Sequence, residues 1–322
     1  MDFSSPKSVK TNGIRMEYFE QGEGPAVLLL HGFPELPYSW RHVADPIAAA
    51  GFRVIVPAQR GYGGTDAPRG PESYTVKNLV ADLTGLLDSL NIAEAIWVGH
   101  DWGGMPAWYS AHYAPDRVRG IASIGLPYVH LGEYDLVEAY DQLLGPQNYM
   151  RAFQEPGSAE ALLQGDVAHT FRSILRGRGY TRDEFEAAPA EVRELPAGVF
   201  VGEPMLFGDP IVTDDELAYY VRTFTSSGFT GPLNWYRALH ADYLEAQGLD
   251  YAIDKPALMI KVTDDWFFQR GATDGIAEFV PRLTFAVIDD AAHWVQQEKP
   301  AEVVKLLVPW LVDNFGDRTD AP

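Results

Sequence analysis

Residues 95–104 read AIWVGHDWGG, and this stretch decides how the rest of the chain is interpreted. Its first four residues form a short apolar run that is typical of a strand buried on both faces of a parallel sheet. Glycines at 99 and 103 allow the sharp strand-to-helix turn that exposes a nucleophile, because small residues let the backbone close there. Where the G-x-S-x-G form of this turn holds serine, the chain has Asp101, and it contains no G-x-S-x-G elsewhere. Asp101 is therefore the candidate nucleophile, while the alternative role for an aspartate at this place is a simple helix cap.

The pattern of this stretch recurs along the chain. Further short apolar runs lie at residues 26–30, 53–57, 121–125, 256–263 and 283–288. Helical patterns lie between or after them, at residues 40–50, 76–90, 105–113 and 301–314. This alternation predicts an α/β fold with a mostly parallel sheet and right-handed crossovers. Residues 8–19 alternate around Asn12-Gly13 and predict a β-hairpin.

The strand signal disappears between Pro127 and about Gln247, where the sequence is helix-like and rich in Tyr, Phe and Leu. A helical insertion into one α/β domain explains this change better than two sequential domains. We therefore predict a core of residues 1–127 and 246–322 and an inserted helical cap, or lid, of residues 128–245.

The composition excludes several classes of function. The chain has 25 Lys+Arg against 45 Asp+Glu, a formal net charge of −20, so we expect neither nucleic acid nor an anionic membrane as a partner. It has no cysteine, which excludes a disulfide framework, a thiolate metal site and a cysteine nucleophile. The first apolar run is far shorter than a signal sequence or a membrane span, so we expect a soluble cytoplasmic protein.

Two more candidate catalytic residues follow later strands. Asp265 follows the run at 256–263 and His293 follows the run at 283–288, which gives the chain order nucleophile, acid, base. The motif HGFPE at residues 31–35 follows the first buried strand, where a backbone N–H can join that of Trp102 in an oxyanion hole. The other histidines show no zinc-binding spacing, so we expect no metal and no organic cofactor.

Together these motifs resemble those of the α/β-hydrolase family, and specifically the soluble epoxide hydrolases. The resemblance spans nearly the whole chain, including the insertion. Its markers are HGFPE at 31–35, RGYGGTD at 60–66, GHDWGG at 99–104, FQEPG at 153–157, GPLNWYR at 231–237 and HW at 293–294. The two motifs in the insertion are the specific ones, since dehalogenases and perhydrolases share the GHDWGG and HGFPE patterns.

The resemblance implies roles for particular residues. In that family two cap tyrosines point at the nucleophile, and the insertion motifs place them at Tyr149 and Tyr236. Alignment with the family pattern around residues 256–259 selects Asp265 rather than its neighbour Asp264 as the triad acid. A phenol is a competent general acid, which suits opening of a strained ether ring.

The implied reaction takes a small-molecule epoxide and water to a vicinal diol. Asp101 attacks an epoxide carbon to give an alkyl-enzyme ester, and His293 then activates the water that hydrolyses this ester. The backbone N–H groups of Phe33 and Trp102 would hold the oxyanion. The expected substrate-contacting side chains are Phe33, Trp102, Phe153, Trp235 and Phe267. The chain is expected to be a monomer or a homodimer.

Two alternative functions stay open. A haloalkane dehalogenase would use the same Asp-His-Asp triad, but it needs N–H donors for the halide instead of phenols for an alkoxide. The residue after His31-Gly32 is Phe33, whereas haloalkane dehalogenases of the common type have asparagine there. The second alternative is a non-catalytic receptor for a small apolar ligand on the same scaffold, against which the complete triad and both tyrosines argue.

Overall fold

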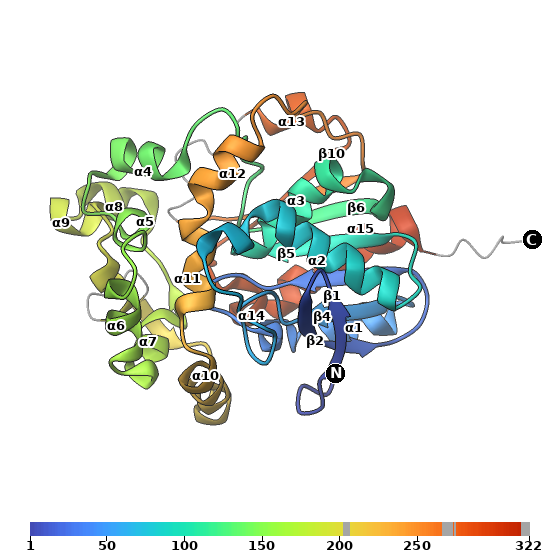
Figure 1. The fold of residues 1–322 in the computed structure, drawn as a ribbon, viewed down its shortest axis with the longest axis horizontal. Helices are drawn as coiled ribbons and strands as arrows, with labels where there is room; N and C mark the ends of the chain where they lie inside the picture. Colours follow the sequence, from blue (N-terminus) through green and yellow to red (C-terminus); the bar gives the residue numbers. More distant parts are fainter. Residues whose placement is uncertain (202–206, 266–272, 274, 317–322) are drawn as a thin grey trace, which may run out of the picture.

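The centre of the protein is an eight-stranded β-sheet (Figure 1). The computed structural model describes residues 1–201, 207–265, 273 and 275–316. In spatial order the strands are β1 (Lys7–Thr11), β2 (Ile14–Gln21), β4 (Arg53–Pro57), β3 (Ala26–Leu30), β5 (Ala95–His100), β6 (Val118–Ile124), β9 (Ala257–Val262) and β10 (Leu283–Ile288). β1 pairs with β2 and β2 with β4 in antiparallel fashion, and every other pair is parallel. The predicted hairpin and mostly parallel sheet are confirmed.

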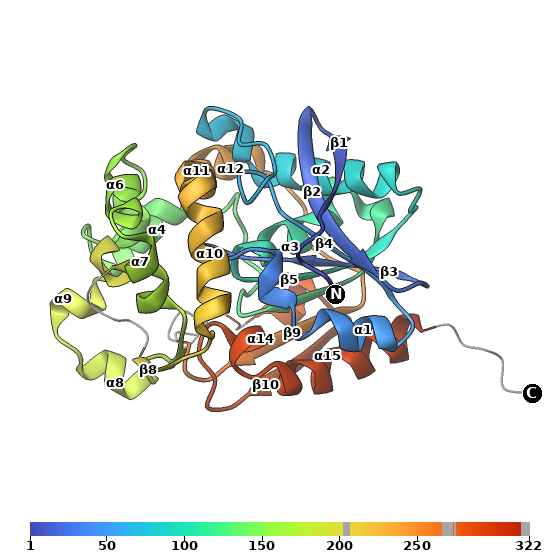
Figure 2. The same ribbon diagram turned by 90° about the horizontal axis from the view of Figure 1, so that it is seen from below.

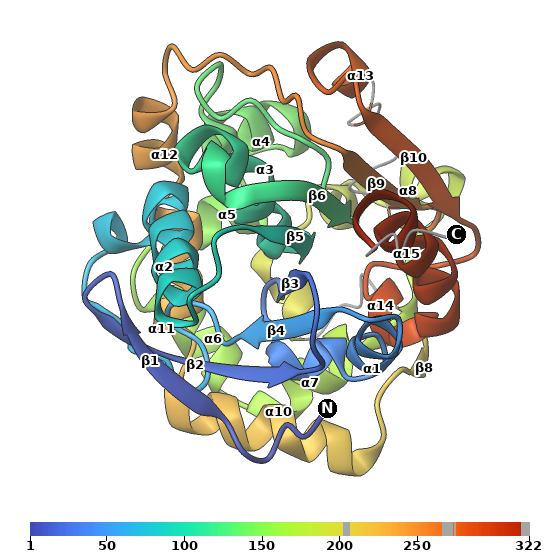
Figure 3. The same cartoon turned by 90° about the vertical axis from the view of Figure 1, so that its right-hand side faces the viewer.

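Helices cover both faces of the sheet, which is why its central strands are apolar throughout. No residue of β3 or β5 is exposed, as expected for strands buried on two sides. Figure 3 shows α2 (Val76–Ser89) and α3 (Gly104–Tyr113) on one face and α1 (Ala44–Ala49) and α15 (Pro300–Phe315) on the other. Two short helices, α13 (Ile276–Phe279) and α14 (Val295–Glu298), flank the last strand.

One helix differs from its predicted bounds. Residues 40–50 were expected to form a single helix, but the structure has a 3-10 turn at Pro37–Trp40 and then α1 from Ala44. Pro46 explains the break, because proline lacks an N–H and fits a helix only within its first turn. A helix that began at Trp40 would place Pro46 in its interior.

Residues 128–245, called here the helical segment, lie on one side of the sheet (Figures 1 and 2). Their helices are α4 (Leu136–Leu144), α5 (Tyr149–Ala152), α6 (Ser158–Gln164), α7 (Val167–Ile174), α8 (Arg182–Ala187), α9 (Ala190–Arg193), α10 (Asp214–Ser227), α11 (Thr230–Arg237) and α12 (Leu239–Glu245). A small antiparallel pair, β7 (Arg176–Arg178) and β8 (Phe207–Pro210), was not predicted, because strands this short carry no readable alternation. None of the helices in the described ranges is long and apolar enough to cross a membrane.

One contact between the helical segment and the rest of the protein is made by backbone atoms with no side chain between them. A Cβ on Gly231 would lie 2.6 Å from the carbonyl oxygen of Gly61, and a Cβ on Gly61 would lie 2.9 Å from the Cα of Gly231. Gly61 also has a φ of +87°, which glycine adopts without strain. Beside this contact, the indole N–H of Trp235 donates to the carbonyl of Arg60 at 3.0 Å.

A second junction uses a buried carboxylate. Asp242 on α12 accepts the backbone N–H of Val76, at the start of α2, at 2.7 Å. Its other oxygen, Oδ2, is buried without a hydrogen-bond partner among the described residues. Burial raises the pKa of Asp242 well above its ordinary value. The group therefore favours its neutral form in the folded protein.

Candidate active site

Asp101 lies in a tight turn between β5 and α3. Its φ is +49°, in the left-handed region that residues other than glycine rarely adopt. A Cβ on Gly99 would lie 2.1 Å from the carbonyl oxygen of Gly103, and a Cβ on Gly103 would lie 2.2 Å from that of Leu30. The glycines that the sequence singles out are therefore required by backbone contacts. The strained turn holds the Asp101 side chain at the carboxyl end of the sheet, where substrate sites of α/β folds lie.

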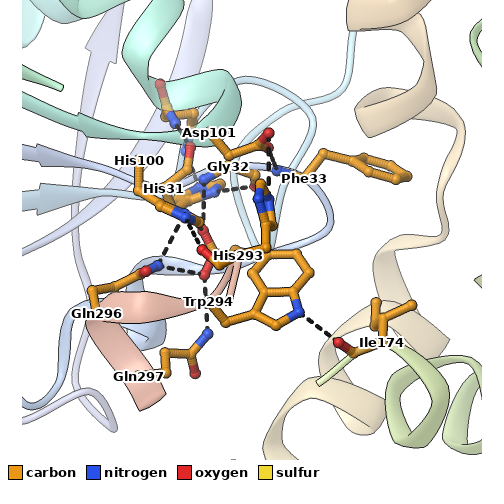
Figure 4. Close-up of polar contacts among 12 residues, drawn as sticks. His31, Gly32, Phe33, His100, Asp101, Ile174, His293, Trp294, Gln296 and Gln297 are labelled. Carbon is orange, nitrogen blue, oxygen red and sulfur yellow. Dashed lines mark hydrogen bonds and ion pairs between the residues drawn. The ribbon is translucent and has the colours of Figure 1, made fainter. Parts of the chain in front are cut away.

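The structure places His293 between two carboxylates. Its Nδ1 lies 2.7 Å from Oδ2 of Asp265. Its Nε2 lies 3.6 Å from Oδ2 of Asp101 (Figure 4). Asp265 follows β9 and is only 2% exposed, while His293 follows β10. The neighbouring Asp264 directs Oδ1 to the hydroxyl of Thr263 at 3.2 Å. Of the two adjacent aspartates, Asp265 is thus the one bonded to the imidazole.

The two carboxylates control the charge of the histidine. Burial lowers the pKa of His293, but the charge and hydrogen bond of Asp265 and the charge of Asp101 outweigh it and raise this pKa to about 9. Burial raises the pKa of Asp101, and the charges of His293 and His100 oppose this rise. At neutral pH the free site therefore favours the imidazolium form of His293.

Two backbone donors point at Asp101. The N–H of Phe33 donates to Oδ1 at 2.8 Å, and the N–H of Trp102 also bonds this carboxylate. The structure therefore brings together the pair of donors expected from the sequence. Because Oδ1 accepts from Phe33, Oδ2 is left facing His293.

A buried polar network lies beneath these residues (Figure 4). His100 bonds Oε2 of Glu35 through Nδ1 at 2.7 Å and the carbonyl of His293 through Nε2 at 2.8 Å. A carbonyl only accepts, so Nε2 of His100 carries a hydrogen. The side-chain amides of Gln296 and Gln297 donate to Oε1 of Glu35 at 2.7 and 3.0 Å. The network fixes the backbone that carries the candidate base.

Glu35 was not singled out from the sequence, although it stands in the HGFPE motif. It is fully buried, and the N–H of Gly32 donates to its Oε2 at 3.0 Å. Burial raises the pKa of Glu35, but the bond and charge of His100 and the Gly32 donor together hold it below its ordinary value. Its position directly after Gly-Phe-Pro could have indicated Glu35, because the turn that follows the strand places this residue next to the edge of the sheet.

Both tyrosines expected from the sequence lie near Asp101, the candidate nucleophile. The ring of Tyr236, on α11, lies 4.8 Å from that of Trp102 and 5.0 Å from that of Phe33. The ring of Tyr149, at the start of α5, lies 6.1 Å from that of Tyr236. Burial, reinforced by the charge of Asp101, raises the pKa of both phenols well above its ordinary value. Both phenols are therefore neutral at pH 7 and able to donate a hydrogen bond.

The structure describes two of the three further side chains that were expected to line the pocket. Phe153 is fully buried, and its ring lies 5.0 Å from that of Tyr236 and 5.7 Å from that of Phe33. Trp235 packs edge-on against Trp102 at 5.9 Å, with its N–H turned to the backbone of the protein core. Phe267 lies outside the described residues.

Two aromatic residues join this cluster without having been expected. The ring of Phe200 lies 5.6 Å from that of Tyr149, and Tyr140 bonds Tyr149 through its side chain. Neither residue stands in a motif, so no sequence signal indicated them. Among the residues that the structure describes, no cluster of side chains suited to a metal ion occurs.

The strand order, the glycine-closed turn and the aspartate on it define the class of protein as an α/β hydrolase, and a family model described as alpha/beta hydrolase fold matches residues 25–300. Epoxide hydrolase A of Mycobacterium tuberculosis is 38% identical over 97% of this chain and 98% of its own length. The crystal structure of epoxide hydrolase A from Mycobacterium thermoresistibile superposes with a TM-score of 0.85 at 40% identity, covering 95% of this chain and 98% of that one. The bifunctional epoxide hydrolase 2 of Sus scrofa is 37% identical over 93% of this chain, which spans 53% of that longer protein.

The chain belongs to the epoxide hydrolases of the α/β-hydrolase family, and it is a hydrolase.

Proposed function

We propose that this protein hydrolyses epoxides to vicinal diols through an ester on Asp101. The observation that carries this proposal is the pair of buried phenols, Tyr149 and Tyr236, beside a carboxylate that has its own imidazole base. A carboxylate attacks saturated carbon without prior deprotonation, whereas the leaving oxygen of an epoxide needs an acid. The names of the relatives support the same chemistry.

In the first half-reaction, Oδ2 of Asp101 attacks an epoxide carbon. The carbon–oxygen bond of the ring breaks, and the oxygen remains attached to the neighbouring carbon as a developing alkoxide. Tyr149 and Tyr236 donate hydrogen bonds to this oxygen and supply its proton. The product is a hydroxyalkyl ester on Asp101.

In the second half-reaction, His293 takes a proton from water, and the water oxygen attacks the ester carbonyl carbon. Negative charge develops on Oδ1, which already accepts the N–H of Phe33, and the N–H of Trp102 bonds the same carboxylate. The acyl bond between Cγ and Oδ2 of Asp101 breaks, and the diol leaves with Oδ2 and a proton from His293. The acid proton left on Asp101 returns to the phenolate, which restores the Asp101 carboxylate. Esterification removes the Asp101 charge that raises the pKa of His293, which favours the neutral base needed for this step.

We also propose that the helical segment is a cap on a core of residues 1–127 and 246–322. Its support is the division of labour in the site: Tyr149 and Tyr236 come from the helical segment, whereas Asp101, His293 and Asp265 come from the core. The acid and the nucleophile therefore meet only where the two parts pack together.

The proposal is tested by trapping the ester. His293→Gln should still open styrene oxide but should stall, so the mass of the protein should rise by one epoxide, localised to the peptide that carries Asp101. Asp101→Asn is the matched control and should take no label. Unlabelled His293→Gln protein, together with diol production by the wild type, would overturn the covalent route. Halide release from 1-chlorobutane that outpaces diol formation would replace it with dehalogenation.

A further inference from the structure

The loop that carries His293 is fastened at both neighbours of that residue. On one side, the backbone N–H of Ala292 donates to Oε2 of Glu298 at 2.8 Å. On the other side, the indole N–H of Trp294 donates to the carbonyl of Ile174 in the helical segment (Figure 4). The position of the imidazole therefore depends on contacts that lie outside the catalytic residues.

Glu298 is a half-buried acid that the proposed reaction does not use. It ends α14 and lies under the helical segment, where a Cβ on Gly177 would be 3.5 Å from its Cγ. Burial raises the pKa of Glu298 to about 7, opposed by the Ala292 N–H and by Lys299 and reinforced by Asp264. An acid is costly to keep in such a place unless its oxygen serves as an acceptor.

Other bonds tie the same loop to its surroundings. The N–H of Asp290 donates to the hydroxyl of Thr263 at 2.9 Å, and the ammonium of Lys299 donates to the carbonyl of Asp289 at 3.0 Å. These bonds act at the start of the loop, before the histidine. The bond to Glu298 acts on the residue directly before His293, and the bond from His100 acts on the carbonyl of His293 itself, so the backbone of the histidine is held on both sides.

We propose that Glu298 is a positioning residue for ester hydrolysis: through the N–H of Ala292 it holds the imidazole of His293 in line with the water and the Asp101 ester. This inference rests on the proposed function. A displacement of about 1 Å in a catalytic group costs on the order of 100-fold in rate, so a bond that fixes the adjacent backbone has a measurable effect. The first half-reaction needs no base, so Glu298 acts on the second half-reaction alone.

The test uses variants that separate loss of the hydrogen-bond acceptor at Glu298 from a change in side-chain volume. Glu298→Met keeps an unbranched side chain of similar length but removes the acceptor, and Glu298→Gln keeps an oxygen that the Ala292 N–H can reach. Glu302→Gln is the matched control, because this residue lies one helix further along and is ion-paired with Lys305 at the surface. Rapid-quench single-turnover experiments with styrene oxide measure formation and decay of the ester separately.

Glu298→Met is expected to slow ester decay by about 10- to 100-fold, the equivalent of one charged hydrogen bond, and to leave ester formation within about twofold of the wild type. Glu298→Gln should restore decay to within about threefold, and Glu302→Gln should match the wild type. A structural role alone would lower the amount of labelled protein without changing the decay constant, since that constant is a property of folded, labelled molecules. Glu298→Ala carries the same test through a smaller side chain if the methionine variant does not fold.

Unchanged ester decay in Glu298→Met or Glu298→Ala would overturn the positioning role. Decay as slow in Glu298→Gln as in Glu298→Met would also overturn it, because an acceptor would then be insufficient. These results differ from failure of the proposed function, in which the wild type itself would form no ester on Asp101.

Discussion

Replacing Asp265 by asparagine should slow diol formation by about 100- to 10,000-fold, whereas the same change at Asp264 should leave it within about threefold. Asp265 lies 2.7 Å from Nδ1 of His293 and is 2% exposed, so its charge acts on the imidazole with little screening by water. The charged hydrogen bond alone accounts for about 10- to 100-fold. An asparagine can also present its NH₂ to Nδ1 and stabilise the wrong tautomer, which accounts for the rest.

The pH dependence gives an independent measure of the same change. Burial lowers the pKa of His293 and the Asp265 charge raises it, so removal of that charge should lower the His293 pKa both in the free site, where it is about 9, and in the ester. The assay is ester decay across pH in Asp265→Asn, with Asp264→Asn as the matched control. Asp264 bonds Thr263 instead of the imidazole. Comparable losses in the two variants, or a larger loss at 264, would refute the assignment of the acid.

Three further changes have clear expected outcomes. Tyr149→Phe and Tyr236→Phe should each slow ester formation in single turnovers by about 10- to 1,000-fold, and a double variant near the wild-type rate would contradict the role of the phenols. Gly103→Ala should destabilise the protein by about 3 kcal/mol in urea unfolding, because its Cβ would lie 2.2 Å from a carbonyl oxygen of β3, while Gly198→Ala meets no atom within 4 Å and should change little. Burial raises the pKa of Asp242, so the wild type should lose unfolding free energy as pH rises above the ordinary aspartate pKa, and Asp242→Asn should reduce this slope while the contributions of Glu298 and His293 remain.

Much of the core could be predicted from the sequence because its signals are local. The buried strands are unbroken apolar runs. The turn at Asp101 needs glycines at fixed positions relative to the aspartate, because close backbone contacts leave no room for a Cβ there. The chain order of Asp101, Asp265 and His293 followed from which strands they succeed. The structure places the two carboxylates 2.7 and 3.6 Å from the nitrogens of the His293 imidazole.

The rest of the site could not be predicted because its partners are distant in the chain. Glu35 owes its burial to residues 65 and more than 250 positions away, and no periodic pattern records such a contact. Asp264 and Asp265 are adjacent residues of like chemistry that face different partners, a difference set by loop geometry alone. Phe200 joined the aromatic cluster by folding of the helical segment, which has no repeating pattern to place it.

The paired glycines at 61 and 231 bear on how new substrate ranges can be built from this scaffold. Exchange of helical segments between relatives is an obvious route, because this segment supplies both proposed acids, Tyr149 and Tyr236, and much of the surrounding aromatic cluster. In a recombinant chain, a residue other than glycine at position 61 or 231 would place its Cβ 2.6 to 2.9 Å from the opposing backbone. Tyr236 lies five residues after Gly231. A backbone shift at Gly231 would therefore displace this proposed proton donor. The crossover points of such libraries should therefore be chosen so that glycine is retained at both positions together.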